Sequence, residues 1–355
     1  MLQQFDQFYC VHKPLFLLYL CLAKQVRLHN NVCFNLFIAL LWGVLDIVLI
    51  PASIRENCPS LTRADNFLSF WQETLEQLNS VELAIEVMER EETDDGLLLQ
   101  RITFKSLDEA IIHAYLLTPQ NSEPSPLVVY THGYIGHCEV IWPWARQGVS
   151  VFGIDIRGYG RSRKAITQPS SHGYALTGIE SEKTSVLRGA VCDYIRGTEV
   201  ARHLLNNKQQ RTVMYGTSFA GALASMSAAV THYADYLVAA VPTFAWAQGR
   251  RQLVKKGSGA EINDYISSHP TQEQSIMRVL SYFDTMNFAP LIECDSFIGV
   301  GLDDSVVPAE TVYAFINHLS CQKQIRHFPV SHTSLPEEKL WKNFEKEWLN
   351  IILSN

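Results

Sequence analysis

The stretch MYGTSFAGALA, residues 214–224, places a serine between a short apolar strand and a helix rich in small residues. A Gly-x-Ser-x-Gly turn at such a junction exposes the serine hydroxyl at the edge of a sheet, where it can act as a nucleophile. Gly216 and Ser218 fit that pattern, and Ala220 stands where the second glycine is usual. Both flanking positions must be small because the strand and helix backbones nearly touch there, and alanine adds only a methyl group. We therefore expect Ser218 to be a nucleophile. The alternative is a helix N-cap, a position that serine favours.

Apolar runs separated by helical segments surround this turn. Runs of this kind are typical of strands buried on both faces of a mostly parallel sheet with crossover helices. Nearer the N-terminus, three segments alternate or run apolar, and the turn at residues 94–96 predicts an antiparallel meander. The sequence thus predicts an α/β fold with a mostly parallel central sheet, antiparallel N-terminal strands and flanking helices. We expect strands within residues 82–91, 97–105, 110–119, 127–133, 149–155, 211–216, 236–242, 296–301 and 325–330.

One helix is predicted from its spacing of apolar side chains. Residues 63–78 present an apolar stripe that would lie on the body of the protein. The stripe consists of Phe67, Phe70, Trp71, Leu75 and Leu78.

Composition limits the functions that the chain can have. Its 355 residues are 47% apolar and carry a net charge of −7, with no basic run longer than Lys255-Lys256. A nucleic acid is therefore not an expected partner, because little in the sequence would neutralise its phosphates. The eight cysteines show neither the spacing of a zinc site nor that of a disulfide framework. We expect a cytoplasmic globular protein without a metal site.

The N-terminal region differs from the rest, and we place a boundary between a hydrophobic extension, residues 1–56, and a main domain, residues 57–355. Residues 32–50 are apolar apart from Asn35 and Asp46 and approach the ~20 residues that a membrane helix needs. An aspartate in the hydrocarbon is costly, which argues against a membrane span. A membrane anchor, a packed helical extension and a start assigned too early all stay open.

Polar loops that follow Ser218 supply the other groups of a catalytic triad. A serine nucleophile needs a histidine base and an acid that orients this base. Asp303 and Asp304 follow one predicted strand, and we prefer Asp304 because it falls further into the loop. His332 follows another strand. We prefer it as the base over His327, which lies inside that strand, where a structural histidine is commoner.

The developing oxyanion of acyl transfer needs two preorganised N–H donors. We expect one from the backbone amide of Phe219, directly after the nucleophile at a helix N-terminus. The second is expected from the amide of Tyr134, in the loop after an earlier strand. In the same loop, His132 is interpreted as a hydrogen-bonding residue without proton-transfer duty. A triad with two amides requires no metal and no organic cofactor.

The motifs, taken in order, resemble the acetyl xylan esterase and cephalosporin C deacetylase group, carbohydrate esterase family seven. The resemblance runs from about Asp65 to His332, through NFLSFWQETL, HGYIGH, GIDIRGYGRS, YGTSFAGALA, LSYFDTMNFA, GVGLDDSVVPAETVYAFINHL and HFPVSH. It implies the α/β-hydrolase fold and a serine esterase that removes acetyl groups from sugars or related small esters. Residue by residue, it implies Ser218 as nucleophile, Asp304 as acid, His332 as base, and Tyr134 and Phe219 as oxyanion donors.

Three departures from the family's pattern concern the substrate. Tyr159 replaces the glutamine of Arg-Gly-Gln, Phe219 and Ala220 replace Gln-Gly, and Thr333 replaces the glutamate after the histidine. Phe219 and Tyr159 are expected to make the pocket more apolar than that of a sugar deacetylase. Arg157, in the same turn as Tyr159, is expected to pair with a carboxylate or with backbone carbonyls.

The resemblance also implies a homo-oligomer, most simply a hexamer. Residues 157–211 exceed the dozen or so that a crossover needs, so part of them must leave the sheet. Residues 169–199, with Arg188 and Asp193, resemble the element that makes subunit contacts in this family. A lid over Ser218 is the alternative role.

The predicted triad and oxyanion donors are compatible with other activities. A triad does not identify the leaving group, so a peptidase or an acyltransferase on the same fold is a second interpretation. A catalytically silent binding protein with a hydrolase fold is a third.

Overall fold

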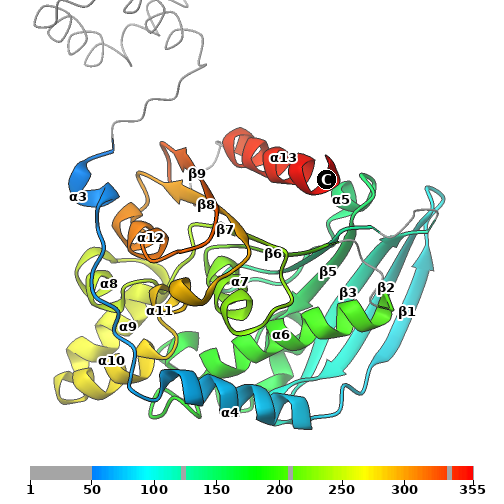
Figure 1. Cartoon of the computed structure of the whole chain (residues 1–355). Coiled ribbons are helices and arrows are strands. Elements are labelled where there is room, and N and C mark those ends of the chain that lie inside the picture. The colour runs from blue at the N-terminus through cyan, green and yellow to red at the C-terminus, as the bar shows by residue number, and fades with distance from the viewer. Residues whose placement is uncertain (1–49, 121–124, 207–210, 334–337, 355) are drawn as a thin grey trace, which may run out of the picture. The chain divides into compact units, whose positions relative to one another are not determined.

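The computed structural model describes most of the chain, and residues 51–355 form one compact unit (Figure 1). Residues 1–49, and with them nearly all of the candidate membrane segment, lie outside the described residues. No helix of the described part is both long and apolar enough to cross a bilayer. The described residues are 50–120, 125–206, 211–333 and 338–354.

Contacts cross the predicted boundary at residue 56. Residues Ala52–Arg55 form the short helix α3. The Asn317 side-chain amide donates to the carbonyls of Arg55 (3.0 Å) and Asn57 (2.9 Å). The Asn57 amide in turn donates to the carbonyl of Glu310 at 2.8 Å. Residues 52–57 are thus bound to the main domain.

A nine-stranded sheet with the order β1-β2-β3-β5-β4-β6-β7-β8-β9 forms the centre of the unit. The strands β1, β2 and β3 form an antiparallel meander, and β3 pairs antiparallel with β5. All pairs from β5 to β9 are parallel. The predicted α/β architecture is confirmed. The strands are β1 Glu86–Glu92, β2 Leu97–Lys105, β3 Ile111–Pro119, β4 Leu127–Thr131, β5 Ser150–Asp155, β6 Thr212–Thr217, β7 Tyr236–Ala240, β8 Asp295–Gly301 and β9 Lys323–Phe328.

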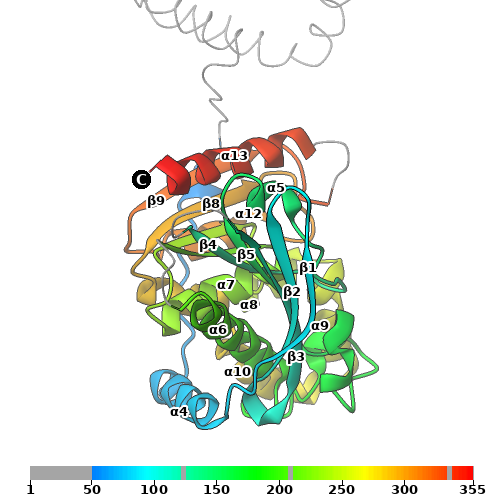
Figure 2. The same ribbon diagram turned by 90° about the vertical axis from the view of Figure 1, so that its right-hand side faces the viewer.

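Helices cover both faces of the sheet (Figures 1 and 2). The helices α5 and α13 lie on one face, and α6 and α7 lie on the other, with α4 as an outer layer beyond α6. The helices are α3 Ala52–Arg55, α4 Phe67–Ser80, α5 Trp142–Ala145, α6 Val186–Leu204, α7 Phe219–Val230, α8 Ala247–Leu253, α9 Gly257–Ser268, α10 Glu273–Ser281, α11 Thr285–Phe288, α12 Ala309–Ile316 and α13 Glu338–Ser354. Short 3-10 turns are η1 Leu107–Glu109, η2 Gly160–Ala165, η3 Tyr174–Leu176, η4 Pro270–Gln272 and η5 Ala289–Leu291.

The helix predicted over residues 63–78 is α4, and four of its five stripe residues are buried. Leu75, the fifth, is only partly buried, and Thr74 is buried in its place. The reason is polar: the Thr74 hydroxyl accepts a hydrogen bond from Arg188 Nε of α6 at 3.0 Å. The inner face of α4 therefore combines apolar packing with one arginine contact.

The residues between β5 and β6 divide into a surface excursion and a crossover helix. Residues 186–199, the second half of the element that resembles a subunit contact, belong to α6, and this helix is buried over nearly its whole length. This half of the element packs between the sheet and α4 of its own chain (Figures 1 and 2). The excursion occupies residues 156–185, with η2 and η3 as its regular turns.

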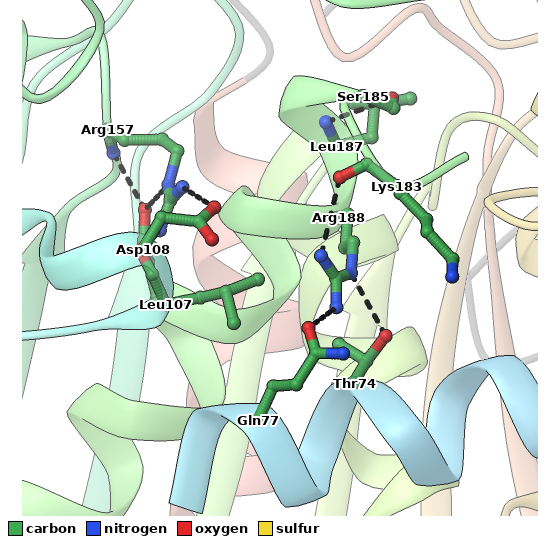
Figure 3. A network of polar contacts seen from close by, with 10 residues as sticks. Thr74, Gln77, Leu107, Asp108, Arg157, Lys183, Ser185, Leu187 and Arg188 are labelled. Atoms are coloured by element: carbon green, nitrogen blue, oxygen red, sulfur yellow. Dashed lines mark hydrogen bonds and ion pairs between the residues drawn. The ribbon is translucent and has the colours of Figure 1, made fainter. Parts of the chain in front are cut away.

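Two arginine networks hold α6 in place (Figure 3). The Arg188 guanidinium also donates to Gln77 Oε1 at 2.6 Å and to the Lys183 carbonyl at 3.3 Å. The Arg157 guanidinium forms a bidentate pair with Asp193 (2.7 and 2.9 Å) and donates to the Leu107 carbonyl. Arg157 therefore pairs with a carboxylate and a carbonyl, as predicted. The side chains of Arg188 and Asp193 thus form their hydrogen bonds with other residues of the same chain.

Candidate active site

Ser218 stands in a sharp turn between β6 and α7. Its φ of 59° and ψ of −114° lie in a region that non-glycine residues rarely adopt and that often marks a functional site. The turn is held by two backbone bonds: Ser218 N donates to the Ala240 carbonyl at 2.9 Å, and Thr243 N donates to the Ser218 carbonyl at 3.2 Å. The side chain of Ser218 is partly exposed, so the turn presents its hydroxyl toward solvent.

The two small residues beside Ser218 are not equivalent. A Cβ on Gly216 would come within 2.2 Å of the Ala220 carbonyl carbon, which is backbone and cannot move aside cheaply. Ala220 keeps its methyl group while only 1% exposed. The close approach thus requires glycine before the serine but admits alanine after it.

Asp304 lies in the loop after β8, and its side chain is completely buried. Its Oδ1 accepts from the amides of Val306 (2.9 Å) and Val307 (2.8 Å). Its Oδ2 accepts from the amide of His332 at 3.1 Å and from His332 Nδ1 at 2.5 Å. All of these donors favour the ionised carboxylate. Burial alone would raise the pKa of Asp304, but the bonds to His332 and to the amides outweigh burial and lower it.

His332 is oriented by this contact. A carboxylate only accepts hydrogen bonds, so Nδ1 carries the proton and the lone pair of Nε2 is left on the other side of the ring. The rival histidine, His327 of β9, instead pairs its Nε2 with the hydroxyl of Tyr313 on α12 at 2.7 Å. The rival acid, Asp303, is exposed to solvent. The structure brings Asp304 and His332 together and leaves both rivals apart from them.

Ser218 and His332 line one cavity of about 600 Å³ at the carboxyl edge of the parallel strands. This is the edge at which α/β sheets bind their ligands. The oxyanion loop, residues 132–140 between β4 and α5, forms part of the lining. The other lining residues include Tyr130, Ile141, Trp144, Tyr215, Thr243, Ser258, Val306, Thr333 and Glu345.

The residues expected to supply the oxyanion amides lie beside the serine. Phe219 is the first residue of α7, so its amide is at a helix N-terminus. Tyr134 lines the same cavity as Ser218, and its ring packs against that of Phe219 with centroids 5.6 Å apart. His132 binds the loop as expected: its Nδ1 contacts the Gly133 carbonyl at 2.8 Å, and its Nε2 accepts from the amide of Ile156 at 3.2 Å.

A polar anchor of Tyr134 was not predicted from the sequence. The phenol donates to Glu261 Oε2 at 2.6 Å and accepts from the amide of Ala175 at 3.0 Å. Burial, together with the bond to Glu261, raises the pKa of Tyr134, so the phenol stays protonated and can donate. Glu261 lies on α9, and no motif in the sequence marks it.

Aromatic rings surround this anchor. Tyr134, Tyr159, Tyr174 and Phe219 pack against one another with centroids between 4.4 and 6.4 Å apart. Tyr159 and Phe219, which were expected to make the pocket more apolar, both belong to this cluster, but of its four rings only that of Tyr134 lines the catalytic cavity. The expected effect of Tyr159 and Phe219 on the pocket is therefore indirect, through the packing of Tyr134. Trp144 is 1% exposed and packs against Trp348, so it is a core residue with one edge on the cavity.

A metal site was not predicted. Within the described ranges, no three histidine, cysteine, aspartate or glutamate side chains are grouped so as to hold a metal ion.

The part of the chain that contains these motifs matches a known protein family. The family model for acetyl xylan esterases matches residues 46–347. The chain belongs to the acetyl xylan esterase family. The recognition made from the motifs is confirmed.

Individual members of this family are distant in sequence. An acetyl esterase of Xylanibacter ruminicola is 21% identical over 286 residues, which cover 77% of this chain and 64% of that relative. A solved acetyl xylan esterase of a Paenibacillus species is 24% identical, with a TM-score of 0.74 over 84% of this chain and 99% of that one. One of a Thermoanaerobacterium species is 22% identical, with a TM-score of 0.77 over 87% and 99%. These similarities establish the α/β-hydrolase fold.

Proposed function

We propose that this protein is a serine esterase that removes acetyl groups from acetylated sugars or related small esters. The observation that carries the proposal is the position of three side chains, from the loops after β6, β8 and β9, at one edge of the sheet. Ser218 and His332 line one cavity, and His332 is held by the buried Asp304 at 2.5 Å. Membership of the acetyl xylan esterase family supports the choice of an acetyl ester over an amide.

Acyl transfer proceeds in two steps with these groups. His332 Nε2 takes the proton of the Ser218 hydroxyl as the oxygen attacks the ester carbonyl. The tetrahedral intermediate collapses when His332 returns this proton to the departing alcohol, which leaves an acetyl ester on Ser218. Water, deprotonated by the same imidazole, then releases acetate and restores the serine. Asp304 holds the ring and stabilises the imidazolium that forms in each step.

The oxyanion is assigned to the amides of Phe219 and Tyr134. Preorganised donors of this kind contribute strongly, since loss of one costs ~10²–10³ in kcat in a serine protease. The bond between the Tyr134 phenol and Glu261 supports the assignment, because it ties the side chain of the donor residue to α9. The rings of Tyr159, Tyr174 and Phe219 pack against Tyr134 and hold it at the wall of the cavity, an arrangement that supports a preference for a small acyl group.

A hydrolysis screen tests the proposal. Acetyl, butyryl and octanoyl esters are compared with an acetylated xylo-oligosaccharide, a cephalosporin and a dipeptide amide. We expect the highest kcat/KM on acetyl esters and none on the amide. Ser218→Ala, prepared in parallel, is the blank for contaminating esterase and should lose activity by about 10⁵–10⁶-fold. A higher kcat/KM on octanoyl esters, or turnover of the amide, would replace the deacetylase assignment.

A further inference from the structure

A second cavity lies on the other side of the oxyanion loop. Its volume is about 510 Å³, and its lining includes Arg101, Arg161, Arg163 and His137. Ile135 lines both this cavity and the catalytic one. One residue of the loop that carries Tyr134 therefore separates the two spaces.

Two of the basic side chains of this cavity contact a carboxylate, and two do not. Arg101 pairs with Glu89 at 3.1 Å, and His137 contacts Glu139 at 2.6 Å. Neither Arg161 nor Arg163 has a carboxylate within ion-pair distance among the residues that the structure describes. Two exposed guanidinium groups without an ion-pair partner in the described part of the chain therefore border a cavity whose lining also includes the carboxylates of Asp155 and Glu139.

Asp155 also lines the cavity, but its carboxylate is committed to the backbone. Its Oδ1 accepts from the amide of Cys138 at 2.7 Å, and its Oδ2 accepts from the amide of Arg161 at 2.9 Å. One buried carboxylate thus fixes both walls, the oxyanion loop and η2. The Ser162 hydroxyl, which accepts from His113 N at 2.8 Å, binds η2 to β3 as well. The backbone that carries the arginines is therefore held in place before any ligand arrives.

The position of Ile135 connects this cavity to catalysis. It is 78% exposed, and its φ of 62° is rare for a β-branched residue. Strained backbone with an exposed apolar side chain is common at ligand-binding sites. Ile135 is the residue that the lining of the catalytic cavity shares with the lining to which Arg161 and Arg163 belong.

We propose that Arg161 and Arg163 make this cavity a subsite for an anionic group, a carboxylate above all, on the alcohol part of the ester. This inference rests on the proposed esterase function. An acetyl group ends one carbon beyond the scissile carbonyl and cannot extend past Ile135, so the anion belongs to the leaving alcohol. Arginine suits the task because its planar guanidinium binds a carboxylate through two parallel hydrogen bonds. The substrate class is an acetylated sugar chain that carries an acid residue near the acetylated position.

Steady-state kinetics on two matched substrates test the subsite. One is an acetylated xylo-oligosaccharide with a uronic acid side group, and the other is the same molecule with its carboxyl group reduced to a hydroxymethyl. We expect the KM of the acid to be lower by about three- to tenfold, the size of one or two exposed charge pairs. The advantage should shrink as salt is raised from 0.05 to 0.5 M, because exposed charges are screened.

Variants of the two arginines test whether they cause the difference in KM. Arg161→Gln with Arg163→Gln should abolish the difference in KM between the two substrates and leave kcat on the neutral one unchanged. Lys164→Gln is the matched control, because Lys164 is an exposed cation of the same turn that does not line the cavity.

The outcomes distinguish failure of the proposed subsite from failure of the proposed esterase function. Equal KM values for both substrates in the wild type would overturn the subsite while acetyl ester hydrolysis stood. A loss of discrimination in Lys164→Gln equal to that in the double variant would also overturn it, since the effect would then come from overall charge. Absence of turnover on both substrates would count against the esterase function itself.

Discussion

At the scale of single residues, the candidate site depends on which member of each neighbouring pair faces inward. Asp303 and Asp304 are adjacent, yet Asp303 is exposed while the Asp304 side chain is fully buried against His332. The loop after β8 turns between them, and the amides of Val306 and Val307 hold Asp304 in its place. Chemical type alone does not distinguish the two aspartates, but their partners do.

Substitution of these aspartates separates them functionally. Asp304→Asn keeps the shape of the side chain but favours the wrong histidine tautomer, so kcat on an acetyl ester should fall by about 10⁴. Asp303→Asn is the matched control and should change kcat less than twofold. Equal losses in the two variants, measured at saturating substrate, would show that Asp304 does not orient His332.

Asp304 also predicts a pH dependence of stability. Its pKa in the folded protein is lowered, so the free energy that its ionised form contributes to folding is fully present above the unfolded value of about 4. This contribution is lost as the pH falls through the lowered pKa. The free energy of unfolding in urea, compared between wild type and Asp304→Asn, should differ equally at pH 7 and pH 5. The difference should shrink by pH 3. A difference that already shrinks between pH 7 and pH 5 would contradict the lowered pKa.

At the scale of elements, α6 shows how a charged helix can be buried. Asp193 is 0% exposed and its carboxylate accepts from the Arg157 guanidinium and from the Arg157 amide. This carboxylate binds α6 to the turn after β5, the turn that leads into η2. The position of the candidate anion subsite therefore depends on a buried ion pair some distance from it along the chain.

Removal of one partner of this pair should be costly. Asp193→Ala leaves the Arg157 guanidinium buried without its carboxylate, and we expect a loss of about 3–5 kcal/mol in the free energy of unfolding. The exposed pair of Arg146 and Asp95, at 2.8 Å, provides the comparison, and Arg146→Ala should cost less than about 1 kcal/mol. Urea unfolding of both variants checks the contrast. Similar losses would mean that a buried ion pair contributes no more to the free energy of unfolding here than an exposed one.

At the scale of the whole molecule, the predicted subunit-contact element divides into an exposed and a buried part. Residues 169–185 keep exposed positions at Ser171, His172, Glu180 and Lys183, whereas the part of the predicted element that lies in α6 is buried. Of this element, only the turns before α6 are therefore free to contact another subunit, because Arg188 and Asp193 are buried within their own chain. The family resemblance remains the basis for expecting one.

We predict a homo-oligomer larger than a dimer, most simply a hexamer, for the chain from Asn57 onward. Light scattering across micromolar concentrations measures the mass directly. A monomer mass throughout this range would refute the oligomer and leave the excursion as a cover for the catalytic cavity. Charge reversal at Glu180 and Lys183 should lower the mass only if the turns before α6 form the interface.

The sequence by itself determined the strands, their mostly parallel arrangement and the residues that follow their ends. Ser218, Asp304 and His332 could be proposed because each lies in the loop that follows a predicted strand, and parallel strands bring such loops to one edge of the sheet. The bond between Tyr134 and Glu261, which lie 127 positions apart, could not be foreseen. Nor could the burial of Thr74 instead of Leu75, or the two walls that Asp155 joins. These contacts depend on how helices and turns pack in three dimensions. The local pattern of apolar and polar residues does not indicate which side chains from distant parts of the sequence will be in contact.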